Sequence, residues 1–307
     1  MEKSECIKGR TNPLGSRMKL AVVIPTYGRK QLLSRLLSHL EHQSRLPDIV
    51  VISAPDSTHI GSTSWPRFKA VCIFGKQGLS SQRNQALERV LPDYDIVVFF
   101  DDDFVPASDY LLRVEEAFET HPDWSVLTGH VVSDGVCGPG LSFEEGLKAL
   151  HEDSSKPTRQ PMQIQEFGAY GCNMALRLAH VGDLRFDERL PLYGWLEDVD
   201  FTSQFRRHGR VIRLNTLRGV HLGFKAGRVS GVRFGYSQII NPVYLIQKGT
   251  VPLARGLRLM TRNVLANIAR SLWPEPYVDR RGRLKGNLLG AYHLVRRKVE
   301  PEHILTL

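Results

Sequence analysis

The chain has 307 residues and a mass of 34.7 kDa, and 42% of its residues are hydrophobic and 24% charged. This composition excludes a disordered chain or a fibre, and the length allows one large domain or two smaller ones. The four cysteines form no CxxC pair, which argues against a disulfide scaffold or a thiolate zinc site and fits a reducing cytosol. The N-terminus lacks an apolar core and the longest apolar runs are strand-sized, so we expect neither a secretion signal nor a membrane span.

Charge is distributed unevenly along the chain. Residues 1–204 carry 21 Lys/Arg and 28 Asp/Glu, whereas residues 205–307 carry 20 Lys/Arg and only 4 Asp/Glu. The acidic front indicates that cations are bound there, and the basic tail indicates an anionic partner.

Strands and helices are expected to alternate after a loose polar arm over residues 1–17. Continuous apolar runs predict four buried strands, at residues 20–24, 49–53, 70–74 and 95–100. Leucines at helical spacing predict a helix over 30–43, and residues 80–91 open with serines that can cap another helix. Repeated strand–helix–strand order with fully apolar strands predicts an α/β fold with a parallel sheet covered on both faces.

The regular pattern weakens after residue 131. Residues 138–140 and 153–161 are expected to form mobile loops suited to covering an active site. Order is expected to return over 167–178, followed by a helix from 197 to 208 and a strand over 210–214.

The basic tail contains two candidate helices. Between Pro252 and Pro274, apolar residues recur every three or four positions, and arginines fall on the opposite side. A second segment, 286–298, ends in Arg-Arg-Lys. Basic amphipathic helices of this kind bind anionic lipid surfaces, but they can equally pack their apolar side against the rest of the protein. Both alternatives stay open.

Three consecutive aspartates, Asp101 to Asp103, follow directly after the strand at 95–100. Clustered carboxylates repel one another unless a cation neutralises them, and ligands bind at the carboxyl edge of a parallel sheet. Oxygen ligands suit Mg²⁺ or Mn²⁺, which commonly join carboxylates to substrate phosphates. The triplet therefore predicts a metal–diphosphate site, with an acidic cap on a helix over 107–120 as the alternative.

A second acidic cluster lies at the start of the helix expected at 197. Glu197 and Asp198 come directly after Gly194, Trp195 and Leu196. Carboxylates are stabilised at a helix N-terminus in any case. A carboxylate beside an aromatic platform also suits a sugar site, where it removes the proton of an attacking hydroxyl.

Four motifs occur in an order and spacing typical of one family: VVIPTYGR at 22–29, GLSSQRNQAL at 78–87, FFDDDFVP at 99–106, and a block from FGAYGCNMALR to FDERLPLYGWLEDVDF that ends at 201. Over residues 19 to about 222, the chain resembles the family 2 glycosyltransferases. The resemblance implies the GT-A fold, a Rossmann-like and mostly parallel sheet flanked by helices, and inverting, metal-dependent transfer from a nucleotide-diphosphate sugar. It divides the chain into an arm (1–18), a catalytic domain (19–225) with a nucleotide-sugar half (19–130) and an acceptor half (131–225), and a basic, mainly helical region (226–307).

The resemblance also implies a role for each matching residue. Donor binding is implied for Pro25, Thr26, Arg29, Arg83, Asp101 and Asp102, and metal binding for Asp103 with His221 as an extra ligand. Asp198 matches the catalytic base, and the acceptor and sugar site is implied for Gly171, Asn173, Trp195 and Glu197. The second strand lacks the acidic end residue with which the family reads the base, so Asp56 or Ser53 takes that role. A surface arginine and a structural histidine are the alternatives for Arg83 and His221.

We therefore expect a cytoplasmic glycosyltransferase, peripheral at the inner face of a membrane and active in polysaccharide biosynthesis. Its donor is expected to be a UDP-sugar, its acceptor a saccharide or polyprenyl-linked saccharide, and its cofactor Mg²⁺ or Mn²⁺. A nucleotidyltransferase is the first alternative, but it needs a glycine-rich loop where this chain has only Gly28. A non-enzymatic protein that binds anionic polymers is the second; the tail has no nucleic-acid motif, so no nucleic-acid partner is expected.

Overall fold

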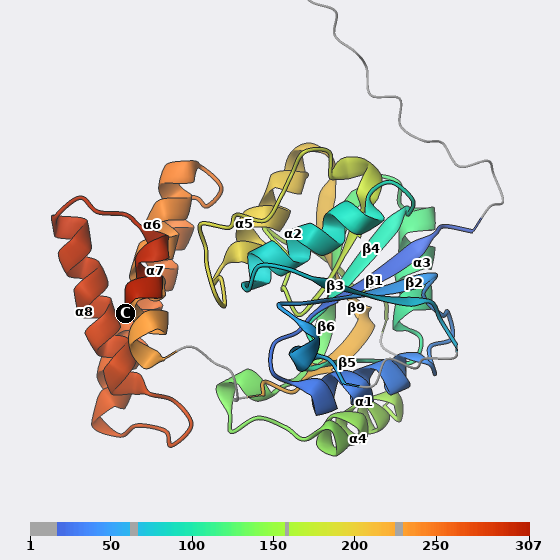
Figure 1. The fold of residues 1–307 in the computed structure, drawn as a ribbon, viewed down its shortest axis with the longest axis horizontal. Helices are drawn as coiled ribbons and strands as arrows, with labels where there is room; N and C mark the ends of the chain where they lie inside the picture. Colours follow the sequence, from blue (N-terminus) through green and yellow to red (C-terminus); the bar gives the residue numbers. More distant parts are fainter. Residues whose placement is uncertain (1–16, 62–66, 157–159, 225–229) are drawn as a thin grey trace, which may run out of the picture.

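The computed structural model describes residues 17–61, 67–156, 160–224 and 230–307, and it confirms the expected α/β fold (Figure 1). One nine-stranded sheet runs through these residues in the order β3-β2-β1-β4-β8-β6-β9-β5, and β7 pairs with β9. The strands are β1 (Leu20–Pro25), β2 (Ile49–Ala54), β3 (Ala70–Phe74), β4 (Ile96–Phe100), β5 (Phe104–Pro106), β6 (Trp124–Asp134), β7 (Gln163–Gln165), β8 (Asn173–Arg177) and β9 (Arg210–His221).

The half of the sheet formed by β3, β2, β1 and β4 is parallel. Every residue of β1, β2 and β4 is buried, which explains their unbroken apolar sequences. Val22 and Ile24 face α1 (Lys30–Leu40) and α3 (Tyr110–Thr120), whereas Val23 faces α2 (Leu79–Val90) and α5 (Glu197–Ser203). Helices thus cover both faces of the sheet, as predicted.

The other half of the sheet is mixed. β8 pairs antiparallel with β4 and β6, and β9 pairs parallel with β6 but antiparallel with β5. β9 continues to His221, beyond the strand predicted at 210–214. Because His221 pairs with Phe104, it lies at the edge of the sheet where the aspartate triplet ends.

Several sequence predictions for residues 138–208 were wrong. Residues 138–140 form neither helix nor strand, but the second predicted loop begins too early, because α4 (Phe143–Ser154) extends into it. We did not predict α4, which begins with a capping box between Ser142 and Glu145. Residues 157–159 of the predicted loop lie outside the described residues. The helix at 197 is shorter than predicted: α5 ends at Ser203 and continues as a 3-10 helix. The short 3-10 helices are η1 (Ser57–His59), η2 (Gly135–Cys137), η3 (Leu178–His180), η4 (Gln204–Arg207) and η5 (Pro301–Thr306).

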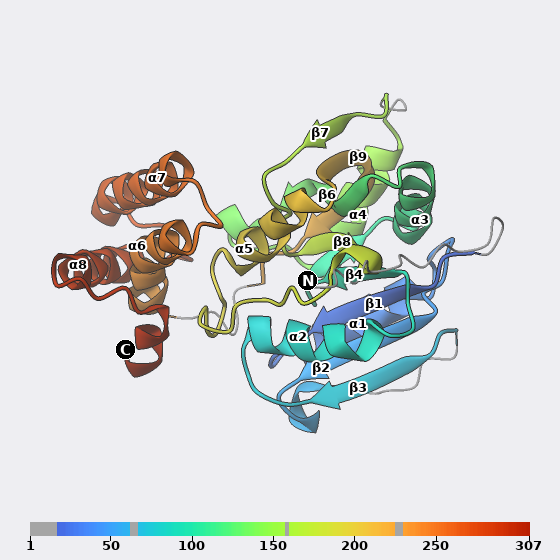
Figure 2. The same ribbon diagram turned by 90° about the horizontal axis from the view of Figure 1, so that it is seen from above.

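Three helices, α6 (Gly231–Lys248), α7 (Leu253–Leu272) and α8 (Arg280–Val295), form a group beside the sheet (Figure 2). The predicted helix between Pro252 and Pro274 is confirmed as α7. Helix α8 begins six residues before residue 286, where the second segment was predicted to start. We did not predict α6, because Pro242 and two glycines obscure its pattern. None of the helices in the described ranges is both long and apolar enough to cross a membrane.

The division into an arm, a catalytic domain and a basic C-terminal region stays a prediction, and residues 1–16 and 225–229 lie outside the described residues. Polar contacts join α6 to the segment around α5. Asn241 donates a hydrogen bond to the Trp195 carbonyl at 2.9 Å, and the Lys248 ammonium lies 2.7 Å from both Asp187 and Asp200.

Glycines allow α6 and α8 to approach backbone to backbone. A Cβ on Gly286 would lie 2.1 Å from the Val232 carbonyl oxygen and 2.6 Å from the Tyr236 nitrogen. We expect Gly286→Ala to lower the free energy of unfolding by about 1–3 kcal/mol, because the backbone clash outweighs the gain in helix propensity. Gly138→Ala is the control, since its Cβ would meet nothing within 4 Å. Equal midpoints of chemical denaturation for the two variants would contradict the close approach.

Candidate active site

The aspartate triplet lies in the turn between β4 and β5, beside the segment that follows β1. Because β1 and β4 are neighbouring parallel strands, their carboxyl ends meet at one edge. Asp102 is nearly fully buried and accepts hydrogen bonds of 2.7 Å from both the Thr26 hydroxyl and the Arg29 guanidinium. Burial raises the pKa of Asp102 to about 6, although Arg29 acts in the opposite direction. Asp102 therefore holds the segment that includes Thr26 and Arg29 against the triplet.

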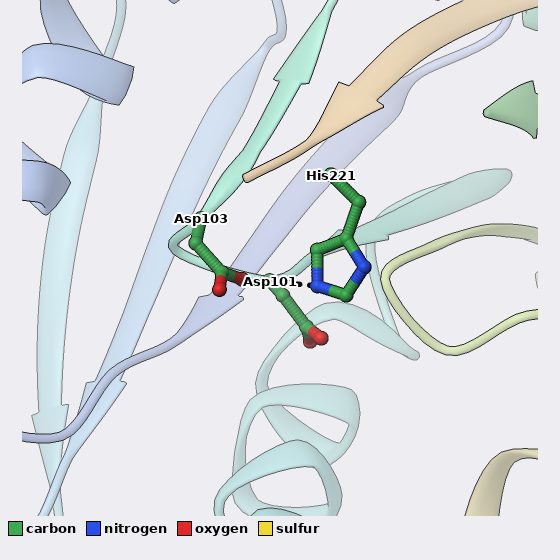
Figure 3. Close-up of side chains that lie close together, drawn as sticks. All are labelled: Asp101, Asp103 and His221. Carbon is green, nitrogen blue, oxygen red and sulfur yellow. Dashed lines mark ion pairs between the residues drawn. The ribbon is translucent and has the colours of Figure 1, made fainter. Parts of the chain in front are cut away.

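Asp101, Asp103 and His221 converge, and one possible ligand atom from each lies within 4.8 Å of the others (Figure 3). His221 Nε2 is 3.4 Å from Asp103 Oδ1, and the backbone N–H of Phe224 donates to Asp103 Oδ2 at 2.9 Å. Burial acts to raise the pKa of Asp103, but His221, Arg29 and the Phe224 N–H together outweigh it and lower the pKa to about 2. Two carboxylates and an imidazole form a donor set that fits Mn²⁺, and Mg²⁺ where waters complete the octahedron.

Two further residues, Asp134 and Tyr170, surround the other nitrogen of His221. Asp134 Oδ1 lies 3.2 Å from His221 Nδ1, and the Tyr170 hydroxyl lies 3.1 Å from both Asp134 Oδ2 and Nδ1. A carboxylate on Nδ1–H leaves Nε2 free to face a metal, which is the usual outer-shell arrangement. Sequence analysis missed both residues: Asp134 belongs to no motif, and Tyr170 lies in FGAYGCN but resembles any aromatic residue.

Arg83 is fully buried, so the alternative of a surface arginine is wrong. Its Nη2 lies 2.8 Å from Asp101 Oδ1 and donates to the Gly171 carbonyl at 2.9 Å, and its Nη1 pairs with Glu197 Oε1. Burial raises the pKa of Glu197 to about 8, although Arg83 acts in the opposite direction. A single guanidinium thus connects the aspartate turn with the first residue of α5. Binding of the nucleotide by Arg83 stays a prediction.

The loop before α5 has an unusual backbone. Leu192, Gly194 and Leu196 have φ values of 60°, 59° and 74°, in the left-handed region that disfavours residues other than glycine. Strained backbone of this kind persists only where the surrounding structure enforces it, and it commonly occurs at functional sites. The loop leads into α5, and its Trp195 side chain packs in an apolar cluster with Leu190 and Leu245, so acceptor contact by Trp195 stays a prediction.

Asp198 is held by backbone groups. Its Oδ2 accepts a hydrogen bond from the Gly171 N–H at 2.7 Å, and its Oδ1 accepts one from its neighbour Val199 at 2.8 Å. Burial raises the pKa of Asp198 despite these hydrogen bonds. A Cβ on residue 171 would lie 3.0 Å from Asp198 Oδ2, so the glycine makes room for the carboxylate.

The remaining predicted site residues differ in burial and in their contacts. Asp56 lies exposed after β2, and its side chain caps η1 through the Thr58 N–H at 2.7 Å. Ser53 is buried, and its hydroxyl finds no hydrogen-bond partner within the described part of the chain. Asn173 is fully buried, where Thr128 and the Gly129 N–H donate to its amide oxygen. Its side chain therefore braces β6 and β8, and sugar contact by Asn173 stays a prediction.

Replacing Arg83 tests the buried ion pairs. We expect Arg83→Met to lower the free energy of unfolding by about 3–5 kcal/mol, because Glu197 and Asp101 lose their common partner. The double variant Arg83→Met/Glu197→Gln should recover part of this loss, since no buried charge is left at residue 197. Arg89→Met, at an exposed position of the same helix, is the matched control. Equal denaturation midpoints for Arg83→Met and Arg89→Met would contradict the pairing.

Comparison with known proteins identifies the family. The model of the family described as glycosyl transferase family 2 matches residues 21–183, more than half of the chain. This chain belongs to glycosyl transferase family 2. The assignment confirms the resemblance inferred from the four motifs, and the acidic cluster of Asp101 and Asp103 fits the family's DxD motif. No curated protein gives a significant match.

Solved structures with low sequence identity share the GT-A fold. The mannosyltransferase PcManGT from Pyrobaculum calidifontis, in complex with GDP-Man and Mn²⁺, is 16% identical, with a TM-score of 0.52 over 95% of this chain and 86% of that one. GalNAc-T7 with UDP, GalNAc and Mn²⁺ is 12% identical, with a TM-score of 0.54 over 95% and 56%. S. aureus TarS 1–349 in complex with UDP-GlcNAc is 14% identical, with a TM-score of 0.50 over 93% and 89%. This chain spans 40% of a longer TarS chain.

Proposed function

We propose that this family 2 enzyme is an inverting, metal-dependent glycosyltransferase. It moves a sugar from a nucleotide-diphosphate sugar to a hydroxyl of a saccharide or lipid-linked saccharide, in polysaccharide biosynthesis. One observation carries the proposal: Asp198 is hydrogen-bonded to Gly171, Gly171 to Arg83, and Arg83 to Asp101 of the acidic cluster. A candidate base and a candidate diphosphate site are therefore held in one connected unit.

Asp198 acts as the general base in this proposal. Its carboxylate takes the proton of the acceptor hydroxyl while that oxygen attacks the anomeric carbon from the face opposite the diphosphate. A new C–O bond forms, the bond to the diphosphate breaks, and the electron pair leaves with the nucleoside diphosphate. Asp101, Asp103 and His221 would hold the Mg²⁺ or Mn²⁺, which supplies charge neutralisation of the leaving diphosphate.

The donor is proposed to be a UDP-sugar, bound at the carboxyl ends of β1 and β2. The exposed ring of Tyr27 supports base binding there, and it stacks on the partly buried ring of His59 with centroids 4.6 Å apart. Asp56, which lies exposed beside His59, and Ser53, which is buried near the end of β2, are the candidates for reading the base. Three structural neighbours are described with GDP-Man, UDP-GlcNAc and UDP, which supports a nucleotide-sugar donor without selecting its base.

Release of product from a panel of donors tests the proposal. We expect one base class among UDP-, GDP- and dTDP-sugars to release its nucleoside diphosphate in the presence of Mn²⁺ but not of EDTA. Release that is insensitive to EDTA would contradict metal dependence. Formation of pyrophosphate from a nucleoside triphosphate and a sugar phosphate would instead support the nucleotidyltransferase alternative.

A further inference from the structure

Helix α7 exposes large apolar side chains that a helix of a water-soluble protein normally buries. Its only buried residues among those described are Gly256 and Asn267. Most of its large apolar side chains point outward, and Leu265 is 60%, Leu272 68% and the adjoining Trp273 80% exposed. We define the α7 ridge as the exposed apolar residues of this helix and its C-cap: Leu253, Leu257, Leu265, Ile268, Leu272 and Trp273. A helix that packs in water usually buries such residues.

Amides and glycines hold the three-helix group together in place of these leucines. The Asn267 amide donates to Gln238 of α6 and to Asn287 of α8, both at 2.8 Å, and Asn287 donates to the Gly235 carbonyl at 2.7 Å. These contacts and the close approach of α6 to α8 already fill the interior of the three-helix group. The α7 ridge is therefore available to another partner. Contiguous exposed apolar residues of this kind mark interaction sites.

A second apolar row lies on α8. Leu288, Tyr292 and Val295 are all exposed and follow one another at intervals of four and three residues, which places them on one side of the helix. The sequence left open whether the apolar side of the tail packs on the catalytic domain. In the structure the α7 ridge and the α8 row are exposed, whereas Leu259 of α7 packs in a cluster with Leu190 and Leu196. The apolar residues of the tail are therefore divided between packing and exposure.

The charge around the ridge selects the partner. Residues 230–307 contain 13 Lys/Arg and 4 Asp/Glu. At about 100° per residue, the exposed Arg258 and Arg262 follow directly after the sector of Leu265 and Leu272 on the surface of α7. A second copy of this chain would bring like charges together, whereas a bilayer with anionic headgroups offers both an apolar layer and negative charge.

We propose that α7 and α8 dock on the surface of an anionic bilayer. The α7 ridge and the α8 row enter the boundary between headgroups and acyl chains, and the flanking arginines contact lipid phosphates. The helices lie in the plane of the interface and do not cross it, in keeping with their hydropathy. This docking does not depend on the proposed transferase activity, because it is measured without donor or acceptor.

Vesicle sedimentation of the full chain tests the proposal. We expect the protein to bind vesicles of phosphatidylcholine mixed with phosphatidylglycerol and to remain free with phosphatidylcholine alone. Leu265→Gln/Leu272→Gln should weaken binding about tenfold or more. The matched control is Leu147→Gln/Met162→Gln, which alters two exposed apolar residues outside the three-helix group, one in α4 and one just before β7, and should bind like the wild type. All four altered side chains are exposed, so we expect unchanged unfolding midpoints.

The charge contribution is tested separately. Arg258→Gln/Arg262→Gln should weaken binding to anionic vesicles by about fivefold for each arginine removed. Added salt should also weaken this binding, because it screens the attraction between the arginines and the lipid phosphates. Three outcomes would overturn the proposal. The first is that the wild type and Leu265→Gln/Leu272→Gln bind neutral and anionic vesicles equally. The second is a concentration-dependent dimer that Leu265→Gln/Leu272→Gln abolishes. The third is that the protein binds duplex DNA and does not bind vesicles.

Discussion

Asp198→Asn is expected to lower kcat by roughly a factor of 10³ and to leave donor binding unchanged, because an amide cannot take the proton of the acceptor hydroxyl. Asparagine retains an oxygen that can accept the hydrogen bond from the Gly171 N–H, so the loop should keep its position. Steady-state kinetics with the donor that the panel selects provide the measurement. Asp183→Asn, which changes an exposed carboxylate nearby in sequence, is the matched control and should keep full activity.

The pH dependence follows from the same group. The base acts in its deprotonated form, so activity is present above the pKa of Asp198 and is lost as the pH falls through it. Because burial raises this pKa, the acidic limb of the kcat profile should lie at a higher pH than for an ordinary aspartate. An Asp198→Asn enzyme with wild-type kcat, or one whose residual activity keeps the same acidic limb, would contradict the assignment of the base.

Asp103→Asn is expected to weaken Mn²⁺ binding by more than about a hundredfold, because replacing even an outer-shell partner of a metal costs about 10–100-fold. His221→Ala should have a comparable effect if Nε2 is a ligand, since its ring lies 3.4 Å from Asp103. Asp134→Asn should cost only about tenfold, because Asp134 acts on the other ring nitrogen. Titration calorimetry with Mn²⁺ measures the series in the absence of substrate.

Asp93→Asn is the control for the metal series, since Asp93 is an exposed carboxylate in the turn before β4. Equal Mn²⁺ affinity in Asp93→Asn and Asp103→Asn would contradict the metal site. Unchanged affinity in His221→Ala alone would restrict the ligands to the two carboxylates.

The parallel half of the fold was predictable from the sequence because β1, β2 and β4 are buried on both faces and read as unbroken apolar runs. Helix α7 was predictable because its apolar period is regular, but the direction of its apolar face was not. That direction depends on Asn267 and the glycines between α6 and α8, which are tertiary contacts. Helix α6 carries Pro242 in its interior, a residue that local propensity assigns to a helix end.

The candidate site was predictable where a motif followed a strand directly. The placement of the aspartate triplet after β4 required only the apolar run before it, and the structure also brings His221 to the triplet. The contacts of Arg83 with Asp101 and Glu197 join residues far apart in sequence, so no local pattern contains them. The same holds for Asp134, which acts through His221.

Thermal unfolding with nucleotides is the most direct measurement of whether the acidic cluster is a metal-dependent donor site. A ligand at about 100 times its dissociation constant adds about 2.7 kcal/mol to stability, a shift of roughly 4 °C for a protein of this size. We expect one nucleoside diphosphate or its sugar to raise the unfolding temperature with Mn²⁺ but not with EDTA. The shift should persist in Asp198→Asn and disappear in Asp103→Asn. A shift that is equal with EDTA, a shift that persists in Asp103→Asn, or no shift with any nucleotide would contradict the proposed donor site.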